Sequence, residues 1–129
     1  DQFATARAEI DNHDFILIHI KATDSCGEDG DFQGKVAVIE AVDSALPELL
    51  QSEPDVIVVT GDHSTPARMR SHSWHPVPLL LWAPETVRQD GASKFGEIAC
   101  ATGGLGSFPA TDVLPLMLAH GRRLSKFGS

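Results

Sequence analysis

The chain has 129 residues, of which 42% are hydrophobic and 22% charged, and this composition is ordinary for a globular protein with one core. Ten basic residues against eighteen acidic residues leave a net charge of −8, which disfavours nucleic acid and anionic membranes as partners. No apolar run reaches the ~20 residues of a membrane span, no signal peptide is recognisable, and Cys26 and Cys100 are too few for a disulfide framework. We therefore expect a single domain over residues 1–129 that works in the reducing cytoplasm.

The N-terminal half predicts a strand between two helices. Residues 1–12 are polar and alanine-rich and resemble the end of a helix, and residues 15–21 are almost continuously apolar, as in a strand buried on both faces. Residues 22–31 hold four carboxylates and two glycines, which predicts a cation-binding loop, with a solvated acidic turn as the alternative. From residue 32 the apolar residues recur at steps of three and four, so we expect a helix to residue 50, kinked or restarted at Pro47.

The centre of the sequence is a second run of apolar and β-branched residues, residues 56–60, which stops at Gly61 and is followed by Asp62 and His63. Strand, helix and strand in this order favour a right-handed crossover and hence parallel strands. Residues 76–83 form a third predicted strand, whose leading prolines suit its start. We therefore predict an α/β fold, with a mostly parallel sheet flanked by helices and the chemistry at the strand ends.

The C-terminal part of the chain predicts little chemistry. Residues 84–95 are expected to connect elements, and residues 96–106 to form flexible, glycine-rich backbone without the spacing of a phosphate loop. The apolar pattern of residues 109–124 predicts a last helix.

Carboxylates and imidazoles gather near the predicted ends of the strands. The set is Asp24, Glu28, Asp62, His63, His72 and His75. Mixed ligands of these two kinds suit borderline divalent ions such as zinc or manganese, and the lack of cysteine clusters argues against a structural zinc knot. Ligands from three strand ends can surround two ions about 4 Å apart, an arrangement that stabilises the attacking and leaving oxygens in phosphoryl transfer.

Three segments of the chain carry specific motifs. Residues 19–24 read His-Ile-Lys-Ala-Thr-Asp, residues 60–66 read Thr-Gly-Asp-His-Ser-Thr-Pro, and residues 72–79 read His-Ser-Trp-His-Pro-Val-Pro-Leu. These segments resemble the archaeal-type, cofactor-independent (2,3-bisphosphoglycerate-independent) phosphoglycerate mutases of the alkaline phosphatase superfamily, and the resemblance covers nearly the whole chain. It implies the C-terminal portion of an alkaline-phosphatase-like metalloenzyme domain with two divalent ions, manganese or zinc, with magnesium or cobalt as further choices.

The resemblance also implies roles for individual residues. Asp62 and His63 would hold one ion, while Asp24 and His72 would hold the other. His72 is preferred to His75 because the family's ligand stands four residues before the Pro-Val-Pro sequence. His75 would then contact the substrate or support a ligand.

The chain departs from the family pattern at two points. Glu28 stands where the family usually carries a histidine, so it would ligate with a harder oxygen donor or leave the site degenerate. The family's nucleophilic serine lies in an N-terminal part with no counterpart here, so we expect no catalytic nucleophile in this chain, Ser64 included. The chain is then expected to be inactive by itself and, with an exposed sheet edge, to self-associate.

For the parent protein the resemblance implies interconversion of 2-phosphoglycerate and 3-phosphoglycerate in glycolysis, through a phosphoserine and with a small-molecule substrate. One alternative is an enzyme that acts on phosphate or phosphonate esters, since sequences of this type have been labelled phosphonopyruvate decarboxylase. Another is a degenerate, metal-poor α/β module that acts through protein contacts. Asp62, His63 and His72 together favour the enzyme, whereas Glu28 and the missing serine favour the module.

Overall fold

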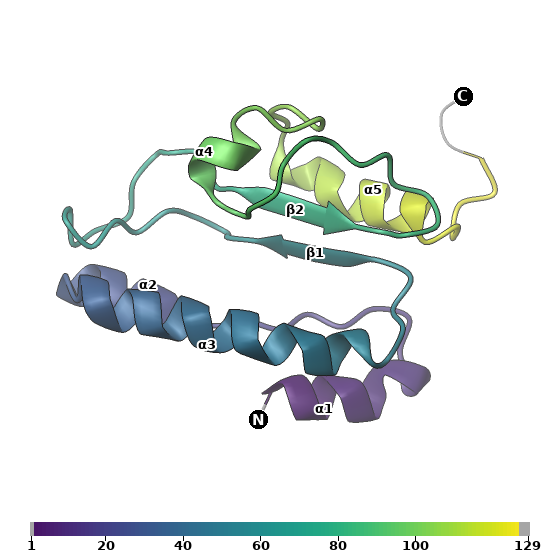
Figure 1. Ribbon diagram of the computed structural model, residues 1–129, viewed down its shortest axis with the longest axis horizontal. Helices are drawn as coiled ribbons and strands as arrows, with labels where there is room; N and C mark the ends of the chain where they lie inside the picture. The colour runs from purple at the N-terminus through teal and green to yellow at the C-terminus, as the bar shows by residue number, and fades with distance from the viewer. Residues whose placement is uncertain (1, 127–129) are drawn as a thin grey trace. The chain divides into compact units, whose positions relative to one another are not determined.

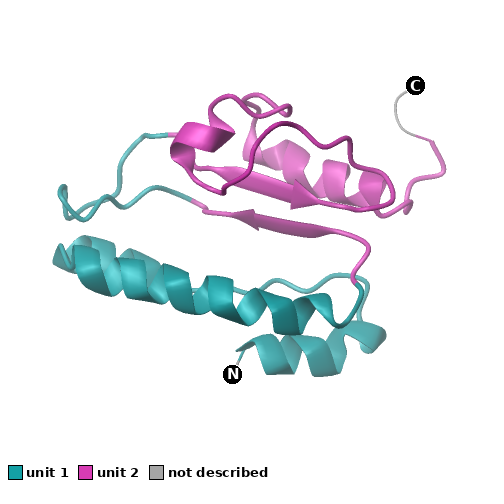
Figure 2. Cartoon of the chain, viewed as in Figure 1, with its two compact units in different colours: residues 1–53, 63–75 teal, residues 54–62, 76–129 magenta. Residues whose placement is uncertain are grey.

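The computed structural model describes residues 2–126, which divide into two compact units (Figure 1, Figure 2). Within this range, the first unit contains residues 2–53 and 63–75, and the second contains residues 54–62 and 76–126. The elements in chain order are α1 (Gln2–Glu9), the 3-10 helix η1 (Ile10–Asn12), α2 (Ala22–Asp29), α3 (Phe32–Leu50), β1 (Ile57–Thr60), β2 (Leu79–Trp82), α4 (Glu97–Cys100), the 3-10 helix η2 (Ala110–Asp112) and α5 (Val113–His120).

The first unit is built on α3, the long helix that the apolar periodicity predicted. Asp31 caps its N-terminus, because its side chain accepts a hydrogen bond of 2.8 Å from the backbone N–H of Gly34. The helix continues through Pro47 to Leu50, so no restart occurs there. Both α1 and α2 pack against α3, and Phe3 and Ala6, one turn apart on α1, are buried.

The acidic segment that follows the first apolar run is a helix, so the prediction of a loop over residues 22–31 was wrong. Residues 22–29 form α2, which ends at Gly30 in the left-handed conformation with φ of 74°. Asp24 lies in the first turn, where the partial positive charge of the helix N-terminus favours a carboxylate. The step of four residues from Asp24 to Glu28 places both carboxylates on one face of the helix.

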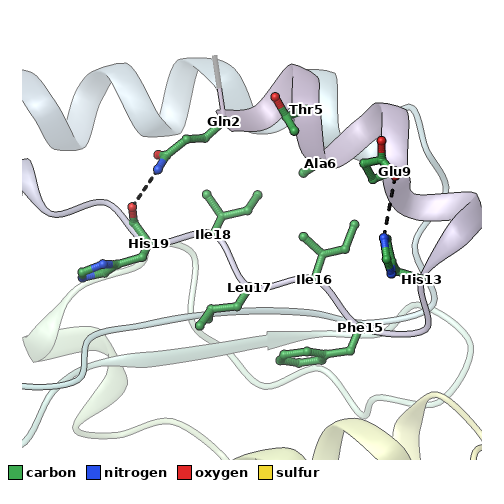
Figure 3. A pocket seen from close by; sticks show the side chains of 10 residues that line it. All are labelled: Gln2, Thr5, Ala6, Glu9, His13, Phe15, Ile16, Leu17, Ile18 and His19. Carbon is green, nitrogen blue, oxygen red and sulfur yellow. Dashed lines mark hydrogen bonds and ion pairs between the residues drawn. The ribbon is translucent and has the colours of Figure 1, made fainter.

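In the predicted strand over residues 15–21, residues 15–20 are extended backbone that joins no sheet within the described part of the chain, and Lys21 turns into α2. The side chains of the extended segment alternate, with Ile16 and Ile18 half-buried and Phe15 and Leu17 exposed by 52% and 79%. His13, residues 15–19 and α1 line a groove of about 500 Å³ (Figure 3). Gln2 donates a hydrogen bond of 3.0 Å to the carbonyl of His19 across the groove.

The second unit contains a two-stranded antiparallel sheet, so the described residues do not show the predicted mostly parallel sheet. β1 pairs with β2 in a register that places Ile57 opposite Trp82 and Thr60 opposite Leu79. The apolar composition of both strands predicts that they are buried, but it does not predict whether they run parallel or antiparallel to each other. Parallel neighbours need a long crossover, usually a helix, whereas residues 61–78 contain no helix and return the chain in the opposite direction.

The remaining elements of the second unit are short. The segment predicted to be flexible and glycine-rich contains α4, and the predicted helix over residues 109–124 is confined to η2 and α5. Asp90 links the segments before and after α4. Its carboxylate accepts hydrogen bonds from the backbone N–H groups of Ala92 and Gly104 at 2.9 and 2.7 Å. No helix among residues 2–126 has the length and apolar character that crossing a membrane requires.

Candidate metal centre

Three of the predicted ligands meet in the first unit. Asp24, His63 and His72 each offer one ligand atom, and these atoms lie within 4.8 Å of one another. Ligand atoms around one tetrahedral zinc ion are about 3.3 Å apart, given bonds of about 2.0 Å, so small side-chain rotations would bring these three atoms around one ion. One carboxylate and two imidazoles are a donor set that fits a borderline divalent cation.

The two histidines meet because the loop after β1 folds back on itself. Ser64 and Ser73 form an isolated antiparallel bridge, in which the N–H of Ser73 donates to the carbonyl of Ser64 at 2.9 Å. Successive side chains alternate between the two sides of extended backbone, so His63 and His72 both project opposite the bridged serines. Their rings pack with centroids 3.9 Å apart at an angle of 32°.

The Asp24 carboxylate is held as an anion. Its side chain is 12% exposed, the Lys21 ammonium contacts Oδ2, and the Thr65 hydroxyl donates to Oδ1 at 2.5 Å. The hydrogen bond from Lys21, followed by that from Thr65, lowers the pKa of Asp24 to about 2. Oδ1 also faces the second histidine, with His72 Nε2 at 3.5 Å. At neutral pH the cluster therefore presents a negative charge beside two imidazoles.

Glu28 lies at the margin of the cluster. Its Oε1 is 3.6 Å from His72 Nε2, and its side chain is 52% exposed. His75 does not join the cluster: its Nδ1 is 2.8 Å from Ser73 Oγ, and its ring stacks on Trp74 with centroids 5.2 Å apart. Asp62 is exposed and belongs to the second unit, so its role as a ligand stays a prediction.

Thr65 and Lys21 are the two site residues that the sequence analysis missed. Thr65 is 3% exposed and contacts both Asp24 and His63. A threonine within a polar motif gives no sequence signal that predicts its burial. Lys21 stands three residues before Asp24, a spacing that brings side chains together on a helix. The signal for Lys21 was therefore present, but it needed residues 22–29 to be recognised as helical.

A sequence model described as the metalloenzyme superfamily matches residues 1–120 of the chain. The chain belongs to the metalloenzyme superfamily. This membership agrees with a site built from carboxylate and imidazole, the donors that such a cluster offers to a divalent ion.

Similar proteins carry a common name. A protein of Thermosipho africanus is 54% identical over 130 residues, and one of Thermotoga sp. (strain RQ2) is 50% identical over 129 residues; each match covers 100% of this chain and 32% of the relative. A Thermus thermophilus protein is 50% identical over 117 residues, which cover 91% of this chain and 29% of that protein. All three are named probable 2,3-bisphosphoglycerate-independent phosphoglycerate mutases. The chain thus spans about a third of the length of these relatives.

A solved structure has the same fold. The PH0037 protein from Pyrococcus horikoshii superposes with a TM-score of 0.92 at 37% sequence identity. The match covers 99% of this chain and 39% of that one. The chain therefore matches one portion of a larger protein of known structure.

Proposed function

We propose that this chain supplies metal ligands to an enzyme that interconverts 2-phosphoglycerate and 3-phosphoglycerate by metal-dependent phosphoryl transfer. The observation that carries the proposal is the convergence of Asp24, His63 and His72 within 4.8 Å, in a chain about half identical to proteins named phosphoglycerate mutases. The bound ions would neutralise the phosphoryl oxygens and activate the nucleophile. Residues outside these 129 would provide the nucleophilic serine.

The complete centre would hold two ions, zinc or manganese in our proposal. Asp24, His63 and His72 would supply three of the ligands, and Asp62 would add a further carboxylate. Glu28 would complete the coordination from the margin, because its carboxylate already approaches His72 Nε2 at 3.6 Å. His75 would face the substrate or support a ligand. The free cysteines, Cys26 and Cys100, accord with a cytoplasmic enzyme.

The extended residues 15–20 would be a further strand of a mostly parallel sheet in the complete enzyme. No hydrogen bond links the backbone of residues 15–18 to other described residues. Unpaired extended backbone readily adds another strand, either from the rest of the enzyme or from a second copy of this chain. We accordingly propose that the isolated chain self-associates.

The test is an activity assay of the full-length enzyme that contains this chain. The protein is stripped of metal with a chelator and assayed with 3-phosphoglycerate before and after addition of manganese or zinc. We expect activity to return with metal in the wild type and not in Asp24→Asn. Asp29→Asn is the matched control, because Asp29 is exposed on the same helix and outside the cluster.

Two results would contradict the proposal. Mutase activity that survives metal removal would exclude the metal role. A metal-restored enzyme that hydrolyses phosphate or phosphonate esters but leaves phosphoglycerate unchanged would favour the alternative substrate class. A parallel assay of the 129-residue chain should show no turnover, and turnover near the full-length rate would place the nucleophile within these residues.

A further inference from the structure

Thr65 occupies an unusual position for a hydroxyl-bearing side chain in a loop. Thr65 is 3% exposed, and among the described residues it is the one polar residue that is buried. In most proteins threonine is exposed. Its hydroxyl oxygen lies 2.5 Å from Asp24 Oδ1 and 3.1 Å from His63 Nδ1. One buried hydroxyl therefore contacts two of the three clustered ligands.

The hydrogen count at this hydroxyl determines the direction of both bonds. A threonine hydroxyl has one proton to donate and lone pairs to accept, and an ionised carboxylate can only accept. The proton of Thr65 must therefore point to Asp24. Since that proton is used, the contact between His63 Nδ1 and Thr65 Oγ1 is a hydrogen bond only if Nδ1 carries the hydrogen.

The position of Thr65 is itself fixed by two other elements. Its backbone carbonyl accepts a hydrogen bond of 2.6 Å from the ammonium of Lys35 on α3. On the other side, Thr65 packs against Gly27 of α2, where an added Cβ would collide with the Thr65 carbonyl and lie 2.9 Å from its Cγ2. The absence of a side chain at Gly27 thus lets the loop approach the helix that carries Asp24. Together these contacts leave the hydroxyl little freedom to turn away.

We infer that Thr65 is a positioning residue of the candidate metal centre: its hydroxyl holds His63 in the Nδ1–H tautomer, so that Nε2 carries the lone pair for the cation. The same hydroxyl orients Asp24 by donating to Oδ1. A neutral imidazole has one protonated nitrogen and one lone pair, so fixing the hydrogen on Nδ1 assigns the ligand atom. Groups that orient a ligating histidine in this way typically change metal affinity by about 10–100-fold when they are removed. This inference rests on the metal site proposed above, and it assigns the ligand atom and the residue that selects it.

The direct test is the tautomer of His63 in the metal-free protein. Histidine labelled with ¹⁵N is observed by two-bond ¹H–¹⁵N correlation at pH 8, where an ordinary histidine with a pKa of about 6.5 is neutral. The His63 signals are assigned by their loss in His63→Asn. We expect the Nδ1–H pattern in the wild type and in Thr65→Ser, which keeps the hydroxyl. In Thr65→Val, which keeps the shape and loses the hydroxyl, we expect the Nε2–H form to become populated.

The second readout is calorimetric titration with zinc or manganese alone. Thr65→Val should bind the ion about 10–100-fold more weakly than the wild type, and Thr65→Ser should bind nearly as well as the wild type. A His63 that is protonated on Nε2 in the wild type would overturn the inference, and so would unchanged tautomer and affinity in Thr65→Val. The wild-type tautomer does not depend on the folding of the Thr65 variants, so it decides the inference even where those variants do not fold. If the wild type binds neither ion, the proposed function fails, while the tautomer still reports whether Thr65 sets the hydrogen of His63.

Discussion

Asp24 and Glu28 lie one turn apart on the same face of α2, yet their surroundings differ. The Asp24 side chain is 12% exposed and is held by Lys21 and Thr65, whereas the Glu28 side chain is 52% exposed and only approaches His72 Nε2 at 3.6 Å. A side chain that is already ordered loses little rotamer freedom when it binds an ion, while an exposed glutamate loses more. Helical spacing therefore brings both carboxylates to the site, but contacts from other segments decide which one is preorganised.

The largest expected effect comes from the held carboxylate. Asp24→Asn keeps the size of the side chain but removes the charge, so binding of zinc or manganese should weaken by at least about 100-fold, the upper range for loss of a supporting group. Calorimetric titration of the metal-free protein measures the affinity. Asp29→Asn, on the exposed part of the same helix, should leave it unchanged. Equal losses in the two variants would mean that general negative charge, and not Asp24, attracts the ion.

The close approach that holds Asp24 can be broken at Gly27. Alanine is the better helix former by up to about 1 kcal/mol, but a Cβ at this position collides with Thr65, and overpacking costs about 1–3 kcal/mol. We expect Gly27→Ala to lower both the free energy of unfolding in urea and the metal affinity. Gly91→Ala adds a methyl group to open space and serves as the control. A stabilised Gly27→Ala protein would show that the loop does not press against α2.

A smaller effect is expected from the exposed carboxylate. Glu28→Gln should weaken metal binding by about 10-fold, the lower range for a supporting group, because the residue pays more conformational entropy to bind. Glu40→Gln on α3 is an exposed control of the same chemistry. Glu28→His, which replaces an oxygen donor with an imidazole, should shift the preference from manganese toward zinc. If Glu28→Gln and Glu28→His both bind manganese and zinc as tightly as the wild type does, Glu28 is not a ligand.

Asp90 offers a carboxylate that is ordered outside the cluster. Hydrogen bonds from the N–H groups of Gly104 and Ala92 lower its pKa below 3.8 in the folded protein. A depressed pKa stabilises the fold above the unfolded-state pKa, and this contribution is lost as the pH falls through the lower, folded-state value. The stability difference between wild type and Asp90→Asn should therefore be constant at pH 5 to 7 and shrink below about pH 4. Urea unfolding at successive pH values measures it, and a difference independent of pH would disprove the role of the charge.

Several features followed from the sequence because they depend on neighbouring residues. The apolar steps from Phe32 to Leu50 predicted α3, since the hydrogen bonds of a helix join residues four positions apart. The types of residue in the motifs around Asp24, His63 and His72 indicated the family and a candidate metal centre, because the donor chemistry of a side chain does not depend on the fold. The helix at residues 22–29 was equally local, but the acidic, glycine-containing sequence of residues 22–31 favoured a loop.

The tertiary structure alone decided the features that join distant residues. The apolar runs of β1 and β2 gave no direction, and the non-helical loop between them set the antiparallel pairing. Residues 15–20 have the same composition but pair with no described strand, because strand hydrogen bonds must come from another segment. Thr65 became part of the site only when Gly27 let its loop approach α2. The burial of Thr65, and the contact of its hydroxyl with both Asp24 and His63, depend on segments that are distant in the sequence. Residue types and local spacing do not predict such contacts.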